Sequence, residues 1–251
     1  KVALADPEVD AVFVLTPNFM HYTVAMDALN AGKHVFCEKP ITVNYALSVE
    51  MAEEAKKQGK MLNIGVCNRY HKSVELLAEM NREGKFGNIY HIYCSFRSFR
   101  SIPGLGGAFT TKAIAGGGVL IDWGVHYLDI VMYCCGDPKP MTVTGEAFCK
   151  LGKDIPAYTF KDMWAGPPVL DGIYDVEESV TAVVRTEGPT FTVHGAWAQN
   201  IGENEMFVDF MGDKGGIRLQ YGKDFTFYST KNDMLTATTF VNRSTPMFQN
   251  E

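Results

Sequence analysis

Long hydrophobic runs and an excess of positive charge are both missing from this sequence of 251 residues. Its longest apolar runs fall far below the ~20 residues of a membrane-spanning helix, so we expect no membrane segment. Lys and Arg number 23 against 29 Asp and Glu, which gives a net charge of −6. No overall positive field therefore draws nucleic acid or an anionic membrane surface to the chain, and we expect neither as a partner.

The six cysteines lack the spacing of a zinc or redox site, because no CxxC or Cys/His pattern joins them. Most lie in apolar runs, which is typical of small buried residues in a reducing compartment. We therefore expect no metal, and composition favours a cytoplasmic protein. With 46% hydrophobic and 21% charged residues, the chain contains enough apolar material for one large or two smaller cores.

The first 68 residues alternate between apolar, β-rich runs and helical segments. The expected strands are 11–15, 34–38 and 61–66, and the expected helices are 19–31 and 43–58. Asn18 and Thr42 are suitable N-caps for these helices. Gly32 and Gly59 are suitable stops. This order with short links predicts two right-handed βαβ units, so residues 1–68 form part of a doubly wound parallel sheet with strands covered on both faces.

Residues 69–251 follow a different pattern. An amphipathic helix over 72–87 and glycine-rich turns lead to a mostly apolar helix closed by Gly136, and strands follow. The expected strands are 88–99, 141–149, 179–186, 190–199, 206–211, 217–221 and 225–229, separated by turn signals. We therefore predict a second, α+β domain over 69–251 with a large, mostly antiparallel open sheet. The chain as a whole is then α/β plus α+β.

Polar residues follow the strands of the first part at the points where the strands end. Thr16-Pro17-Asn18, Glu38-Lys39-Pro40 and residues 67–70 should lie along one edge, beyond the carboxyl ends of the strands, where such sheets bind ligands. Lys39 is then placed at the ligand, with Glu38 in position to hold its ammonium group. The alternative is a solvated ion pair in a loop, which contributes ~0–1 kcal/mol. Position alone does not choose between the two.

Asp122 and His126 form a second constellation, four residues apart on the expected apolar helix that follows three glycines. A carboxylate beside an imidazole orients the ring and holds its charged form, an arrangement typical of a general base near neutral pH. The alternative is a core histidine that a local aspartate satisfies. In either case, two polar side chains on so apolar a helix need partners.

Several segments, taken in order, resemble the glucose–fructose oxidoreductase / inositol dehydrogenase / rhizopine catabolism (Gfo/Idh/MocA) family. They are TPNFMHYTVAMDALNAGKHVFCEKPIT, NIGVCNRY, GGGVLIDWGVHYLDI and FMGDKGGIRL, and together they run over nearly the whole chain. The resemblance implies a Rossmann dinucleotide-binding domain that uses NAD or NADP. Lys39, Asp122 and His126 match the family's catalytic residues, with His126 as general base. The positions that line its cofactor are matched by Thr16, Pro17, Asn18, His21, Glu38, Lys39 and Arg69.

The resemblance also implies an activity, the transfer of a hydride between the nicotinamide cofactor and a secondary hydroxyl of a sugar, cyclitol or glycoside. Further substrate contacts are expected from aromatic and cationic side chains in two loops. The candidates are Arg97, Arg100, Lys112, Tyr158 and Trp164, and each also suits an ordinary surface loop. The C-terminal sheet resembles one whose open face is buried in homodimers and homotetramers.

Three other functions stay open. Some relatives use the same site for redox-assisted, NAD-dependent glycoside cleavage. A non-catalytic dinucleotide sensor or scaffold is the second, although intact Lys39, Asp122 and His126 argue against it. The third is biliverdin- or dihydrodiol-type reduction, which shares the fold but often lacks the histidine that His126 matches. The family's G-x-G-x-x-G turn and its ribose-reading residue have no counterpart in this sequence, so we expect residues 1–251 alone to bind cofactor poorly, and NAD versus NADP stays undecided. A twin-arginine export signal, present in some relatives, would lie ahead of Lys1.

Overall fold

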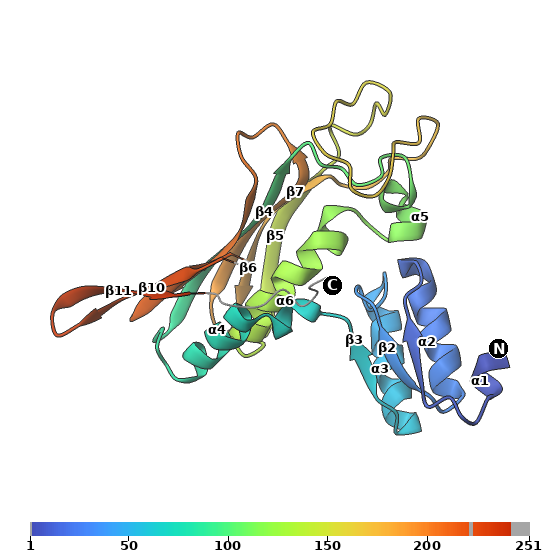
Figure 1. Cartoon of the computed structure of the whole chain (residues 1–251), viewed down its shortest axis with the longest axis horizontal. Coiled ribbons are helices and arrows are strands. Elements are labelled where there is room, and N and C mark those ends of the chain that lie inside the picture. The colour runs from blue at the N-terminus through green and yellow to red at the C-terminus, as the bar shows by residue number, and fades with distance from the viewer. Residues whose placement is uncertain (1, 221–222, 242–251) are drawn as a thin grey trace, which may run out of the picture.

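The structure is a computed structural model that describes residues 2–220 and 223–241. It contains a three-stranded sheet near the N-terminus and an eight-stranded sheet that holds most of the remaining chain (Figure 1). Two separate clusters of buried apolar side chains accompany them, one at each sheet. Every helix in the described part of the chain is too short or too polar to cross a membrane.

The small sheet consists of the parallel strands β1 (Ala11–Val14), β2 (His34–Cys37) and β3 (Leu62–Ile64), in that order. Helices α2 (His21–Asn30) and α3 (Tyr45–Gln58) connect them and pack on the same face, as right-handed crossovers taken in one direction require. Phe13, which points to the opposite face, is 67% exposed. The expectation that these strands are covered on both faces is therefore wrong for the described residues.

The helix starts in this part differ from expectation in two places. The N-cap of α3 is Asn44, whose side chain accepts the capping hydrogen bond, while Thr42 accepts a hydrogen bond from the Asn44 amide at 3.1 Å. A short 3₁₀ turn, Asn18–Met20, precedes α2, and the Asn18 side chain makes no capping bond. Its amide instead donates to the carbonyl oxygen of Ala115 at 2.9 Å, so Asn18 joins the two parts of the chain.

The large sheet has the strand order β11-β10-β9-β8-β4-β7-β6-β5 and is antiparallel except for the β4–β7 pair. The strands are β4 (Ile89–Phe99), β5 (Pro140–Phe148), β6 (Ser179–Thr186), β7 (Thr190–Gln199), β8 (Glu205–Gly212), β9 (Gly215–Leu219), β10 (Phe225–Lys231) and β11 (Met234–Phe240). The predicted fold class is confirmed. Strand β11 was not predicted, and the predicted strand 217–221 ends at Leu219, with Tyr221 outside the described residues.

Helices α4 (Lys72–Arg82) and α6 (Val125–Cys134) pack on one face of the large sheet (Figure 1). The expected single apolar helix is observed as a π-helical segment, Leu120–Gly124, that runs directly into α6. The remaining short helices are α1 (Val2–Ala5), α5 (Lys112–Ala115) and the 3₁₀ turns Cys67–Tyr70 and Ala108–Thr110. The π segment lies between the two parts of the chain, because its Asp122 pairs with Lys39 from the small-sheet part and its Trp123 packs against the core of the large sheet.

Candidate active site

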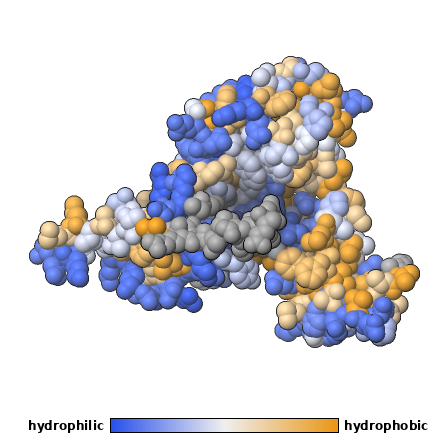
Figure 2. All heavy atoms as spheres, viewed as in Figure 1, coloured by the Kyte–Doolittle hydropathy of each residue, from blue (hydrophilic) through white to orange (hydrophobic). Residues whose placement is uncertain are grey.

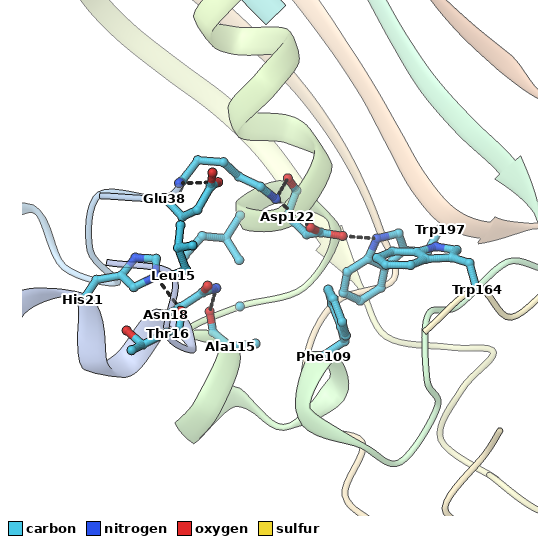
Figure 3. Close-up of a pocket in the computed structure, with 13 residues that line it drawn as sticks. Leu15, Thr16, Asn18, His21, Glu38, Phe109, Ala115, Asp122, Trp164 and Trp197 are labelled. Atoms are coloured by element: carbon cyan, nitrogen blue, oxygen red, sulfur yellow. Dashed lines mark hydrogen bonds and ion pairs between the residues drawn. The ribbon is translucent and has the colours of Figure 1, made fainter. Parts of the chain in front are cut away.

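A cleft of about 250 Å³ opens between the two parts of the chain, where the molecule is hollowed in the space-filling view (Figures 2 and 3). The ends of β1 and β2 form one wall, and the α5 loop, the π segment and the end of β7 form the other. The lining residues are Leu15, Thr16, Asn18, His21, Glu38, Lys39, Phe109, Ala115, Gly117, Ile121, Asp122, Trp164 and Trp197. The structure thus brings together five of the seven residues predicted to line a cofactor, together with Asp122.

Lys39 crosses this cleft. Its ammonium nitrogen lies 2.9 Å from Oδ1 of Asp122 and 3.1 Å from the Asp122 carbonyl oxygen. The expectation that Glu38 holds this ammonium is wrong, because the Glu38 carboxylate accepts from the backbone N–H of Lys39 at 3.2 Å. Glu38 packs against Gly65, where a Cβ would lie 2.9 Å from the carboxylate, and the Lys39–Pro40 peptide bond is cis.

The Asp122 carboxylate has two partners. Oδ1 accepts from Lys39, and Oδ2 accepts from the indole N–H of Trp197 at 3.2 Å (Figure 3). The side chain of Asp122 is 12% exposed and that of Lys39 is 21% exposed, so the ion pair is largely shielded from water. The carboxylate is therefore fixed between a cation from the small sheet and a donor from the large one.

His126 lies at the start of α6, and its Nδ1 is buried without a hydrogen-bond partner in the described structure. The expected Asp122–His126 contact is absent, since the oxygens of Asp122 bond Lys39 and Trp197. Burial and the positive charge of Lys39 lower the pKa of His126 below 6.5, against smaller opposing effects of Asp122, Glu38 and Asp129. The environment favours the neutral imidazole and not the charged form that the sequence suggested.

His21 connects the two strand ends that form the first wall. The side chain is 1% exposed, with Nδ1 2.7 Å from the carbonyl oxygen of Pro40 and Nε2 2.8 Å from that of Thr16. The hydroxyl of Thr16 is buried and has no hydrogen-bond partner among the residues described. Pro17 lies beside the cleft, in a smaller adjoining cavity of about 200 Å³. His21 thus holds the two strand ends of this wall together, and the Thr16 hydroxyl is a polar group in the same wall that a ligand could bond.

Arg69 and Lys112 line a second, larger cavity of about 800 Å³ that adjoins the cleft at Gly117 and Ile121. The guanidinium of Arg69 is bound by Asp129, with Nε 2.8 Å from Oδ2, and lies over the ring of Tyr133. This pairing raises the pKa of Arg69. The structure therefore separates Arg69 from Lys39, and its predicted place at the nicotinamide stays a prediction.

Of the loop residues proposed to bind substrate, Trp164 alone lines the cleft, where its ring meets that of Phe109 edge to face at 5.0 Å. Arg97 pairs with Glu205 on the large sheet. Arg100 donates to Asn200 and to the Thr159 carbonyl and lies over the ring of Tyr158, which is buried. Sequence reasoning missed Trp197 and Phe109, which have no motif and reach the cleft only through packing.

Three acidic residues between 175 and 178 hold the second wall in place. Asp175 accepts from the Lys112 N–H at 2.6 Å, and Glu177 accepts from the N–H groups of Gly118 and Leu120 at 3.0 and 3.2 Å. A Cβ at Gly118 would lie 1.8 Å from the Glu177 carbonyl oxygen, so only glycine fits. Glu178, which is 1% exposed, accepts from the backbone of Lys150 and Leu151 and from the Tyr174 hydroxyl. The bonds to Glu177 fix the start of the segment that carries Asp122.

Two family models match the chain. A model described as an oxidoreductase family with an NAD-binding Rossmann fold matches residues 2–66, and the GFO/IDH/MocA C-terminal domain matches residues 74–218. The chain belongs to the Gfo/Idh/MocA family. The family resemblance seen in the sequence is therefore confirmed. No group of three or more His, Cys, Asp or Glu side chains that could hold a metal ion occurs within residues 2–220 and 223–241.

Relatives within the family include sugar-linked oxidoreductases. D-glucoside 3-dehydrogenase of Escherichia coli K12 is 36% identical over 214 residues, which are 84% of this chain and 58% of that protein. A putative UDP-kanosamine synthase oxidoreductase subunit of Amycolatopsis mediterranei is 31% identical over 87% of this chain and 60% of its own length. The chain thus spans about three fifths of the relatives it matches. A solved levoglucosan dehydrogenase, in complex with NADH and levoglucosan, shares the fold with a TM-score of 0.79 at 23% identity, covering 96% of this chain and 63% of that one.

Proposed function

We propose that the protein is an NAD(P)-dependent oxidoreductase that transfers a hydride between a nicotinamide cofactor and a secondary hydroxyl of a sugar, cyclitol or glycoside. The observation that carries the proposal is the cleft between the sheets, where Lys39 from one part meets Asp122 from the other. His126 is close enough to both for their charges to affect its pKa. The glycoside and sugar substrates named for relatives support this substrate class.

The nicotinamide cofactor that the family implies fits the residues present. The buried hydroxyl of Thr16 needs a partner, and it lies at the carboxyl end of a parallel strand, where dinucleotides bind in open α/β sheets. Thr16, Asn18, Glu38 and Lys39 would hold the cofactor from this wall. When bound, the nicotinamide supplies the hydride acceptor that no amino-acid side chain provides.

The neutral imidazole of His126 is the base in this proposal. Because its pKa is lowered, the ring is uncharged near neutral pH and is able to take the hydroxyl proton at Nε2, since Nδ1 is buried. The Lys39 ammonium stabilises the negative charge that develops on the substrate oxygen. Asp122 keeps that ammonium in the cleft through Oδ1 and its carbonyl oxygen. The aromatic pair Phe109–Trp164 offers a flat apolar surface on which one face of a sugar ring would pack.

A panel assay on the full-length protein tests this proposal. NAD⁺ and NADP⁺ are each offered with glycosides, free sugars and cyclitols, and the reduced cofactor is followed by absorbance. We expect turnover with at least one substrate, and a kcat lower by ~10²–10⁴-fold in Lys39→Met and in His126→Ala. Lys57→Met, an exposed lysine on α3, is the matched control and should retain full activity. Saturable cofactor binding with no oxidation of any compound would instead indicate a sensor, and glycoside cleavage without net reduced cofactor would indicate redox-assisted cleavage.

We further propose a homodimer or homotetramer formed through the face of the large sheet opposite α4 and α6. That face carries an aromatic and basic cluster, with Tyr93 beside both His194 and Phe207 and the Arg218 guanidinium 3.8 Å over the Phe207 ring. Such side chains are enriched at protein interfaces. Light scattering coupled to size exclusion measures the subunit number, and a monomer at micromolar concentration would contradict this proposal.

A further inference from the structure

Trp197 combines full burial with a place in the wall of the cleft. The residue is 0% exposed, yet its side chain lines the cleft beside Asp122 (Figure 3). Its backbone is held on both sides, because its N–H donates to the Glu178 carbonyl at 2.8 Å and its carbonyl accepts from the Ser101 N–H at 2.8 Å. The large sheet and its loops therefore determine where the indole lies.

The indole N–H is one of two donors that meet at the Asp122 carboxylate. It donates to Oδ2 of Asp122 at 3.2 Å, and Oδ1 of the same carboxylate accepts from Lys39 at 2.9 Å. An indole nitrogen and an ammonium group only donate, so both hydrogen bonds point toward the Asp122 carboxylate. Within the described residues, these are the two side chains that bond the Asp122 carboxylate. A rotation of the carboxylate out of this arrangement would break the bond to Trp197.

We propose that Trp197 is a positioning residue that commits the Asp122 carboxylate to Lys39 and keeps it away from His126. The proposal rests on the function proposed above and adds a residue to it. Without the indole donor, Oδ2 is free to turn toward the imidazole, and the ammonium loses its fixed partner. The charged groups that affect the pKa of His126 are Lys39, Asp122, Glu38 and Asp129. Trp197 donates a hydrogen bond to one of them, Asp122.

The contact itself is tested without activity, by NMR of the indole N–H groups in the ¹⁵N-labelled full-length protein. Trp197→Phe identifies the Trp197 signal by its disappearance. We expect Asp122→Asn to shift that signal and to speed its exchange with solvent, because a charged acceptor has been removed. The Trp164 signal serves as an internal reference. A Trp197 signal that moves no more than that of Trp164 would overturn the proposal.

The effect on the reaction is tested by kinetics in two backgrounds. Trp197→Phe keeps an aromatic ring and removes the donor, so we expect kcat to fall roughly tenfold, with KM for substrate and cofactor within about twofold. The acid limb of the rate profile should move to higher pH as Asp122 reaches His126. In a Lys39→Met background, the same change should lower kcat by less than about twofold, because residues that act as a unit are not additive.

Trp123→Phe is the matched control, because Trp123 also contacts the core but is not a partner of Asp122. Equal losses of kcat from Trp197→Phe in the wild-type and Lys39→Met backgrounds would indicate a merely structural role and refute the proposal. If Trp197→Phe does not fold, the indole shift caused by Asp122→Asn decides the matter. Absence of turnover in the wild-type protein would refute the proposed function, while the NMR result would still decide whether Trp197 holds Asp122.

Discussion

The Lys39–Asp122 ion pair should couple the stabilities of the two parts of the chain. The charges are 2.9 Å apart, and at an effective dielectric constant of ~20 they attract by roughly 6 kcal/mol before desolvation. Removing both groups from water offsets most of this attraction. Breaking a buried pair typically costs ~3–5 kcal/mol because one charge is left unpaired. Lys39→Met should cost less, about 2 kcal/mol, since Lys39 is 21% exposed and Trp197 still donates to Asp122.

A double-mutant cycle measures this coupling. Lys39→Met, Asp122→Asn and the double variant are unfolded in urea, and we expect an interaction free energy of about 1–3 kcal/mol. The control is the i,i+3 pair Glu54–Lys57 on α3, whose lysine is 71% exposed, so that Lys57→Met should cost no more than ~0.5 kcal/mol. Costs of the single variants at Lys39 and Asp122 that add within ~0.5 kcal/mol would refute the reasoning, because the pair would then contribute nothing beyond its separate residues.

Two further predictions concern the same region. NMR titration of His126 should give a pKa below 6.5, and Lys39→Met should raise it, because the cation that opposes protonation is gone. In the unsubstituted protein, the unfolded chain binds a proton at His126 more readily than the folded chain does. The contribution of His126 to the free energy of unfolding is therefore fully present above pH ~6.5 and is lost as the pH falls through the folded pKa. Gly118→Ala should lower the free energy of unfolding by ~1–3 kcal/mol, because its methyl group would lie 1.8 Å from the Glu177 carbonyl oxygen. Gly202→Ala, with nothing within 4 Å, should change it by no more than ~0.5 kcal/mol, and thermal unfolding of both variants measures the two effects.

Much of the fold follows from local pattern. Strands β6 and β7 have the bounds predicted for them, since turn residues separate two apolar runs there. The stop of α3 is confirmed at Gly59, which has a φ of 63°. The caps at Asn18 and Thr42 were wrong because several polar residues near each helix start compete for the same role, and Asn18 bonds a residue 97 positions away. Such long-range competition leaves no local signal.

The sequence predicts those parts of the candidate site that lie where an apolar run ends or is interrupted. Lys39 and Asp122 were both identified, because each is a polar residue that ends or interrupts an apolar run. Their pairing was missed, since nothing in either segment gives the distance between them. Trp197 reads as an ordinary strand residue, and its donor role exists only because β7 ends beside the π segment. The boundary after residue 68 remains a prediction.

The one ammonium of Lys39 has two effects in this cleft, and they reinforce each other. A positive charge near the reacting oxygen favours the alkoxide, and the same charge disfavours a proton on His126. A carboxylate bonded to His126 would have worked in the opposite direction, by raising the pKa of the imidazole and lowering the fraction of free base. Committing Asp122 to Lys39 therefore holds the electrophilic group in place and leaves the base neutral. In the proposed mechanism, Asp122 and His126 do not form a carboxylate–imidazole dyad. Asp122 binds the Lys39 ammonium, and the charge of that ammonium keeps His126 neutral.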